Sequence, residues 1–474
     1  MKKLIGKRMI SLVVSLFMCM SLGSVFLASA AAPAKKPTPG IQSITGITTV
    51  MTFGQKVTAI AVEYPANVKP EPIEDPENLD TYTVLDSWYD FRFDSVESLD
   101  DLRPRTITRM YTNDHPATIA DGVSVTGRYV IVELSPLDYG GNTVRTNPAS
   151  SMYIKIMTGT PDMKTQLVQN RPVLTDDGVF LGTPLGAETP TVYQPSAWLD
   201  PLADQFIYGD YCCQQVNASG TITTDLPYYY YIPPDLEPGH VYPMVVILPG
   251  YGMGYYPTTG YSATGHNEKV NVVADIPATA WMQPAWTGSD EKAIVLAPQS
   301  RRTGANYEAT AVLGLMDEFM AAHPEVDAKR LYFSTVSWGS TTAWAMMQQR
   351  PGVFTAGLLT GGFAVSTTQA TAIATARPLT PIYITHGLHD PLLRIASTGY
   401  LSRDRLRAAY VATGLVDADG AAALLPFEAY DTPSYFNQVV PQVPGYAEPD
   451  NHAVMGPTYT DTTKLQWLLS QVKP

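Results

Sequence analysis

Hydrophobic and polar residues alternate along the first half of the chain, in short runs separated by clusters of Pro, Asp, Asn and Gly. Three such runs are 57–64, 127–134 and 152–156. A period of two without helical periodicity between the runs is typical of antiparallel strands. Residues 42–190 therefore predict an all-β sandwich. The acidic, proline-containing segment 68–80 is expected to be a surface loop.

The pattern changes after residue 220, where short continuous apolar runs alternate with helical patterns. The helical patterns are 306–322, 339–350 and a terminal 459–471, and the apolar runs are 244–248, 293–296, 331–333, 356–359 and 381–384. Strands buried on both faces read as continuous apolar runs, and their alternation with helices indicates a mostly parallel α/β sheet. We assign 221–474 to this second domain and 191–220 to the connection between the domains.

The N-terminus has the three parts of a secretory signal. Four positive charges within residues 2–8 precede an apolar run to about Leu27, and Ala28-Ser29-Ala30 supplies small residues at the expected cleavage position. This order predicts a signal peptide at 1–31, followed by a flexible lead at 32–41, and thus a secreted protein. The rival interpretation is a membrane anchor. No later stretch reaches about 18 uninterrupted apolar residues, so no span is expected after cleavage.

Composition narrows the class of protein. The 474 residues are 45% hydrophobic and 16% charged, which excludes disorder for most of the chain. Cleavage of the signal peptide would remove four positive charges, so the formal net charge would change from 31 − 44 = −13 to 27 − 44 = −17. An acidic surface of this size repels polyanions, so nucleic acid is not an expected partner. The adjacent Cys212 and Cys213 are expected to be unbridged, because neighbouring cysteines close only a strained ring.

Ser337 is the candidate nucleophile. It follows a predicted strand and precedes a predicted helix, in Ser334-Thr335-Val336-Ser337-Trp338-Gly339. A serine on such a sharp turn has an exposed hydroxyl and needs small residues two positions before and after it. Gly339 meets the second requirement, whereas Thr335 stands where glycine is usual. A serine before a helix is otherwise an N-cap, and that interpretation stays open here.

A glycine-containing loop, 249–254, follows the apolar run that ends at Leu248. Backbone N–H groups in such a loop stabilise a tetrahedral oxyanion, together with the N–H of the residue after the nucleophile. The expected donors are Tyr251 and Trp338. The alternatives are an ordinary glycine turn and a phosphate-binding loop, but the latter lacks the Lys-Ser/Thr ending.

The acid and the base should follow Ser337 in the order acid, then histidine. Asp390 lies just past the strand that ends near His386, and His452 lies in a polar loop before the terminal helix. We expect Asp390 to be the acid and His452 the base, with His386 structural. His386 and His389 beside Asp390 imitate a metal cluster, but two histidines three apart on a loop are weak support for a metal site, and none is expected.

These residues together indicate nucleophilic catalysis without a cofactor. His452 takes the Ser337 proton, Asp390 orients the imidazole, and Ser337 attacks a carbonyl. An acyl-enzyme forms and water hydrolyses it.

Six segments after residue 220, together with His452, carry a resemblance to a known family. The segments are 226–233, 243–250, 296–299, 327–332, 337–339 and 381–390. In these segments the chain resembles secreted bacterial carboxylesterases of the α/β-hydrolase superfamily that have an N-terminal immunoglobulin-like domain, relatives of depolymerase-like and feruloyl-esterase-like esterases. The resemblance implies an α/β-hydrolase fold after an immunoglobulin-like sandwich, and the triad Ser337, Asp390 and His452. Thr335, and Pro249 in place of a usual histidine, depart from the pattern.

Aromatic residues gather near the site in sequence, and those expected to line a substrate pocket are Tyr255, Tyr256, Trp281 and Trp286. The expected partner is a small-molecule or polymeric ester. Two other functions stay open: a secreted serine peptidase of the same superfamily, and a non-catalytic surface-binding protein, since sandwich domains are common adhesive modules.

Overall fold

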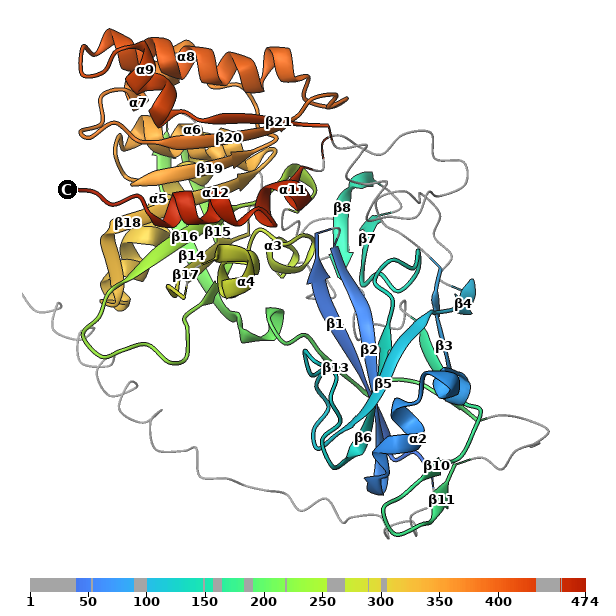
Figure 1. Cartoon of the computed structure of the whole chain (residues 1–474). Coiled ribbons are helices and arrows are strands. Elements are labelled where there is room, and N and C mark those ends of the chain that lie inside the picture. Colours follow the sequence, from blue (N-terminus) through green and yellow to red (C-terminus); the bar gives the residue numbers. More distant parts are fainter. Residues whose placement is uncertain are drawn as a thin grey trace, which may run out of the picture. The chain divides into compact units, whose positions relative to one another are not determined.

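A computed structural model describes most of the chain (Figure 1). The ranges it describes are 40–52, 54–88, 100–147, 150–156, 164–182, 191–217, 220–253, 269–288, 290–299, 305–431, 452 and 454–474. The expected signal peptide, nearly all of the expected lead, and Tyr255 and Tyr256 lie outside these ranges. Within them, no helix is both long enough and apolar enough to cross a membrane.

The first domain is built from two sheets, as the alternating runs predict. One has the order β13 (Ala197–Leu199), β1 (Ser43–Met51), β2 (Gly54–Val68), β6 (Gly127–Leu134), β5 (Ile107–Asn113), and the other β12 (Val192–Tyr193), β9 (Thr165–Gln169), β3 (Tyr82–Ser87), β4 (Leu102–Pro104). Two further pairs are β7 (Val144–Asn147) with β8 (Ser150–Ile156), and β10 (Val173–Leu174) with β11 (Phe180–Leu181). All pairs are antiparallel except β1 with β13.

Strand β2 is buried on both faces. Ile60, Val62 and Tyr64 enter the main core of this domain, as their spacing predicts, whereas Ala59 and Ala61 pack in a smaller cluster on the opposite face. The expectation of a loop at 68–80 is wrong. This segment contains the short helices α2 (Pro70–Glu74) and η1 (Pro76–Thr81), each of which begins at a proline. Proline suits the first helical position because its fixed φ is already helical.

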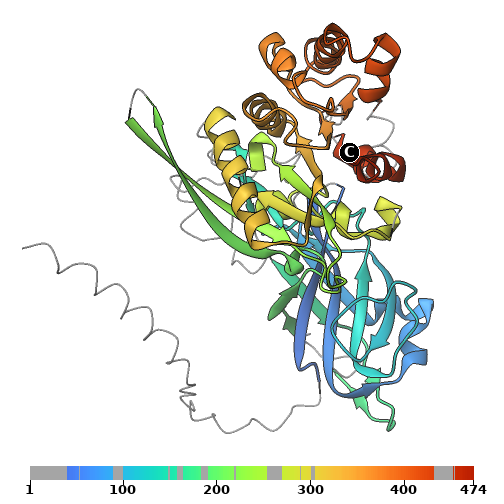
Figure 2. The ribbon, with the colours of Figure 1, turned by 90° about the vertical axis from the view of Figure 1, so that its left-hand side faces the viewer.

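The second domain contains an eight-stranded sheet. Its order is β14 (Ile207–Asn217), β15 (Gly220–Tyr231), β17 (Ile294–Pro298), β16 (Tyr242–Leu248), β18 (Val326–Val336), β19 (Ala356–Thr360), β20 (Ile382–Gly387), β21 (Phe427–Tyr430). From β17 to β21 every neighbouring pair is parallel, as predicted, while β15 is antiparallel to both β14 and β17. Figure 2 shows β14 and β15 as the long green hairpin at the edge of the sheet.

The segment expected as a connection therefore contains strands of both domains. Near its start, β12 and β13 pair with β9 and β1 of the sandwich, and near its end β14 begins the eight-stranded sheet. Between them is a single short helix, η2 (Ala203–Gln205).

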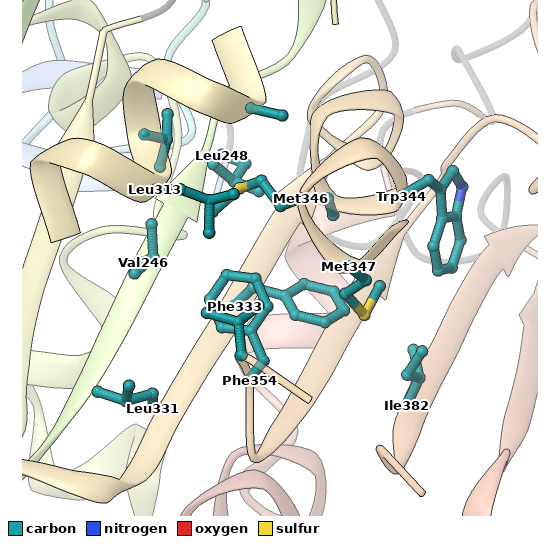
Figure 3. Packing of buried hydrophobic residues seen from close by; sticks show 14 of the residues in the cluster. Val246, Leu248, Leu313, Leu331, Phe333, Trp344, Met346, Met347, Phe354 and Ile382 are labelled. Atoms are coloured by element: carbon teal, nitrogen blue, oxygen red, sulfur yellow. The ribbon is translucent and has the colours of Figure 1, made fainter. Parts of the chain in front are cut away.

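Helices cover both faces of the eight-stranded sheet. Residues of α5 (Ala305–Ala322), α6 (Gly339–Gln349), α7 (Thr367–Ile373), α8 (Gly399–Ala412) and α9 (Ala418–Leu424) pack in one core with alternate strand residues such as Val246 and Phe333 (Figure 3). The second core joins the other strand face to α3 (Val270–Val273), η5 (Ala280–Met282), α11 (Met455–Tyr459) and α12 (Thr462–Leu469). The other helices in the ranges given above are η3 (Tyr251–Met253), α4 (Pro284–Thr287) and η6 (Ile395–Ser397).

The helices α5 and α6 confirm the helical patterns at 306–322 and 339–350. The terminal helix expected at 459–471 is shorter, since α12 begins at Thr462 and ends at Leu469, and a separate short helix, α11, precedes it. Asp461 caps the start of α12, because its carboxylate accepts the Thr463 N–H at 3.0 Å.

Candidate active site

Ser337 occupies a strained turn between β18 and α6. Its φ is 47°, and it is the only residue other than glycine with a positive φ in the described part of the chain. Its N–H donates to the Thr360 carbonyl of the neighbouring strand at 3.0 Å, which holds the turn against β19. A left-handed φ in a residue with a side chain costs energy and is found where the surrounding structure enforces it. The half-buried Ser337 is therefore held in the conformation expected of a nucleophile on such a turn.

The two flanking positions show how closely the chain approaches itself. A Cβ atom at Gly339 would lie 2.1 Å from the Leu248 carbonyl oxygen, so only glycine fits there. Thr335 is fully buried within β18, where it is in register with Leu248 and Leu359. The turn at Ser337 thus forms although threonine replaces the usual glycine at this position.

Asp390 and His452 meet at the carboxyl end of β20. His452 Nδ1 lies 2.6 Å from Asp390 Oδ2. The other carboxylate oxygen of Asp390 accepts the N–H groups of Leu392 and Leu393, both at 2.8 Å. Burial alone would raise the pKa of Asp390, but the hydrogen bond and charge of His452, with the Leu393 N–H, hold that pKa below its ordinary value. Asp390 is thus an ionised, fixed acceptor that selects the Nδ1–H tautomer of His452.

The imidazole of His452 lies beside the segment that holds Ser337. A Cβ atom at Gly361 would be 3.6 Å from His452 Cε1, and the preceding Thr360 carbonyl accepts the Ser337 N–H. Helix α11, which follows His452, is tied to the nucleophile strand because the Tyr459 and Ser334 hydroxyls are hydrogen-bonded. The predicted base and the predicted nucleophile are therefore carried by elements that are directly joined.

The oxyanion loop (Gly250–Met253) follows β16, and η3 forms its last three residues. A Cβ atom at Gly250 would be 3.4 Å from Val336 Cγ1, so the loop begins beside the residue that precedes Ser337. The rings of Tyr251 and Trp338 are in edge-to-face contact, with centroids 5.6 Å apart. Trp338 precedes the first turn of α6, where backbone N–H groups have no intrahelical acceptor. The structure thus brings together the two residues expected to supply oxyanion donors.

Two histidines near Asp390 have different environments. His386 is fully buried, its Nε2 is 3.0 Å from Thr398 Oγ1, and its Nδ1 is 3.9 Å from Asp390. Burial lowers the pKa of His386, against the opposing effects of the Gly387 carbonyl and the Asp390 charge. His389 is exposed. His386 thus lies buried between Thr398 and Asp390, the predicted acid.

Of the four residues expected to line a substrate pocket, only Trp281 has a described side chain, and this side chain lies in the core. Trp281 is 2% exposed and packs edge-to-face on Tyr459 in the core, so its indole is part of the packing. Trp286 lies in α4, but the structure describes only its backbone. Phe363, which sequence reasoning missed, contacts the Trp338 ring at a centroid distance of 5.5 Å. The only sequence signal for it is the glycine pair that precedes it at the end of β19.

Cys212 and Cys213, the two cysteines that the structure describes, form no disulfide, and Cys212 is exposed on β14 while Cys213 is half-buried. In the described ranges no group of three or more His, Cys, Asp and Glu is arranged to hold a metal ion.

Comparisons with known proteins agree with this architecture. Residues 43–182 match the family model of an esterase Ig-like N-terminal domain. The crystal structure of a thermostable esterase is similar over 91% of this chain and 100% of its own, with a TM-score of 0.68 and 21% identity.

Two more distant similarities cover a smaller share of the chain. A dienelactone hydrolase-like promiscuous phosphotriesterase from metagenomic libraries matches with TM-score 0.33, 14% identity and coverage of 57% of this chain and 100% of its own. An acylaminoacyl peptidase of Pyrococcus horikoshii matches with TM-score 0.27, 12% identity and coverage of 51% and 43%. No curated protein matches the chain in sequence.

Proposed function

Because residues 43–182 are an esterase Ig-like N-terminal domain and the chain continues into an α/β-hydrolase fold, we propose that this protein is a secreted serine carboxylesterase. It hydrolyses carboxylic esters through an acyl-enzyme on Ser337, with His452 as base and Asp390 as acid. The observation that carries the proposal is the strained Ser337, with φ 47° at the end of β18, combined with the Asp390–His452 contact of 2.6 Å.

Acylation begins when the Ser337 hydroxyl oxygen attacks the ester carbonyl carbon. His452 Nε2 accepts the hydroxyl proton, and Asp390 stabilises the resulting imidazolium through Nδ1–H. The carbonyl oxygen becomes an oxyanion that accepts hydrogen bonds from the Tyr251 and Trp338 N–H groups. The tetrahedral intermediate then expels the alcohol, which takes its proton from His452, and the acyl group stays on Ser337.

Deacylation repeats these steps with water as the nucleophile. His452 accepts a proton from water while the oxygen attacks the acyl carbon, and the same donors stabilise the second oxyanion. Collapse breaks the bond to Ser337, whose oxygen recovers the proton from His452, and the carboxylic acid leaves. No step uses a metal or a cofactor.

The charge of Asp390 supports this mechanism. Its carboxylate accepts two backbone N–H groups in addition to His452, and its lowered pKa keeps it ionised at neutral pH. An ionised Asp390 favours the Nδ1–H tautomer, in which Nε2 of His452 is the basic nitrogen.

Export is proposed from the signal-like residues 1–31 alone.

The test is a panel of nitrophenyl esters of increasing acyl length, run beside a panel of aminopeptidase substrates. Wild-type protein should hydrolyse the esters, and Ser337→Ala should lose this activity by about a million-fold while its circular dichroism stays unchanged. Cleavage of the peptide substrates alone would favour a peptidase. Inactivity on both panels, with folded protein, would favour a non-catalytic binding function and sink the proposal.

A further inference from the structure

A buried glutamine is hydrogen-bonded to the oxyanion loop. Gln299 follows β17 directly and is 0% exposed. Its side-chain Nε2 donates to the carbonyl of Met253, which is the last residue of η3. Its Oε1 accepts the Asn271 N–H at 3.0 Å, and its own backbone N–H donates to Pro227 at 2.8 Å. These bonds fix which way the amide points, because only the NH₂ group can donate to Met253.

Asn271 holds the other side of the same network. It is 4% exposed on α3, and its side-chain amide donates to the Ile247 and Pro298 carbonyls, both at 3.0 Å. Those two carbonyls stand at the carboxyl ends of β16 and β17. Asn271 therefore joins the ends of the two strands, and through its backbone N–H it also fixes the Gln299 side chain. The network connects the rigid sheet to the loop that carries Tyr251.

We propose that Gln299 is a positioning residue for the oxyanion hole, and that Asn271 supports it. The inference rests on the proposed function, in which the Tyr251 N–H binds the oxyanion. Within the loop the Met253 N–H donates to the Gly250 carbonyl at 3.1 Å, which closes a tight turn around Tyr251. Gln299 ties the far end of this turn to β17. Without that bond, the direction of the Tyr251 N–H is no longer fixed by the sheet.

The consequence for rate follows from how oxyanion donors act. They accelerate the reaction because they are already aimed at the developing charge before the reaction begins. A displacement of about 1 Å in such a group costs on the order of 100-fold in rate, and loss of one donor about 100- to 1000-fold. Misdirection of Tyr251 should therefore lower kcat without abolishing it, and should affect KM little, since the donor acts mainly in the transition state.

The test compares two isosteric substitutions in the full-length protein. Gln299→Glu replaces the NH₂ donor by an oxygen that repels the Met253 carbonyl. The matched control is Gln169→Glu in β9: Gln169 is 3% exposed, and its Nε2 donates to the Arg171 and Leu181 carbonyls of the sandwich. Each substitution removes a buried side-chain N–H group that donates to a backbone carbonyl. Only Gln299 contacts the oxyanion loop, whereas Gln169 does not. Gln299→Met is measured as well, because it removes the donor without adding a charge.

For both Gln299 variants we expect kcat on a short nitrophenyl ester to fall about 10- to 100-fold, with KM within about threefold of wild type. Inactivation by a small phosphonate should slow by a similar factor, because the phosphonyl oxygen occupies the same hole. Gln169→Glu should keep its kcat, although its unfolding temperature falls. A KM change with kcat preserved, or an equal kcat loss in Gln169→Glu, would overturn the positioning role.

Two further outcomes are informative. If both Gln299 variants fail to fold, Gln299 supports the whole domain and not the loop in particular, which also overturns the inference. If wild-type protein hydrolyses no ester and its Ser337 does not react with the phosphonate, the proposed function itself has failed, whatever the Gln299 variants do.

Discussion

Nδ1 of His452 lies 2.6 Å from Oδ2 of Asp390, although 62 positions separate the two residues in sequence. The side chain of Asp390 is fully buried, whereas that of His452 is 15% exposed. The carboxylate is thus enclosed within the protein, while part of the imidazole is exposed. This pair sets the tautomer of His452 on which the proposed mechanism depends.

Asp390→Asn tests the role of that carboxylate. Asparagine keeps the shape but not the charge, so the imidazole loses the partner that selects its Nδ1–H tautomer. We expect kcat for a short acyl ester to fall by about 10⁴-fold, by analogy with the same change in other triads. Asp404→Asn is the control, because Asp404 is exposed and pairs only with Arg403 in the described part of the chain. Retention of activity within tenfold would show that Asp390 is not the acid.

His452→Ala should be nearly as damaging as loss of the nucleophile, because it removes the group that is proposed to accept the Ser337 proton. His389→Ala is the matched control, since His389 is exposed and close to Asp390 in sequence. It should keep wild-type kcat. Full activity in His452→Ala would move the base elsewhere.

His386 should make stability depend on pH. Burial lowers the pKa of His386 in the folded protein, whereas an unfolded histidine ionises near 6.5. Below about pH 6.5 the unfolded state therefore binds the extra proton, and the folded state loses stability as the pH falls towards the folded pKa. His386→Gln should reduce the drop in unfolding temperature between pH 7 and pH 5, and the exposed His389→Gln should not. An unchanged drop in His386→Gln would contradict the assignment.

Gly339→Ala should damage the nucleophile turn. Its Cβ would lie 2.1 Å from the Leu248 carbonyl oxygen, so α6 and β16 must move apart. We expect a loss of stability of about 1–3 kcal/mol, as for overpacking elsewhere, and a larger relative loss of kcat because Ser337 moves with α6. Gly40→Ala, whose Cβ meets no atom within 4 Å, should leave both unchanged. Thermal unfolding and ester hydrolysis measure the two effects.

The parts of the fold that could be predicted are those with local signals. Continuous apolar runs identified the strands β16 to β20, and the strand–turn–helix order around Ser337 identified the turn, even with threonine at position 335. The chain order of acid and histidine then pointed to Asp390 and His452. Each of these inferences needed only neighbouring residues and a rule of chain order.

Other features depend on contacts that no local pattern records. Strand β14 lies at a sheet edge, where exposed and half-buried residues alternate. It contains Gly209, Asp210 and two consecutive glutamines, a composition more typical of a connecting segment than of a strand. The bonds from Gln299 to Asn271 and Met253 span 28 and 46 positions, so only the folded chain brings these three residues together.

The most direct test of Ser337 as the nucleophile is labelling with a small fluorophosphonate, followed by digestion and mass spectrometry. We predict one label per chain, on the peptide that contains Ser337, with none in Ser337→Ala and much slower labelling in His452→Ala. A label on any other serine, or none on folded wild-type protein, would contradict it.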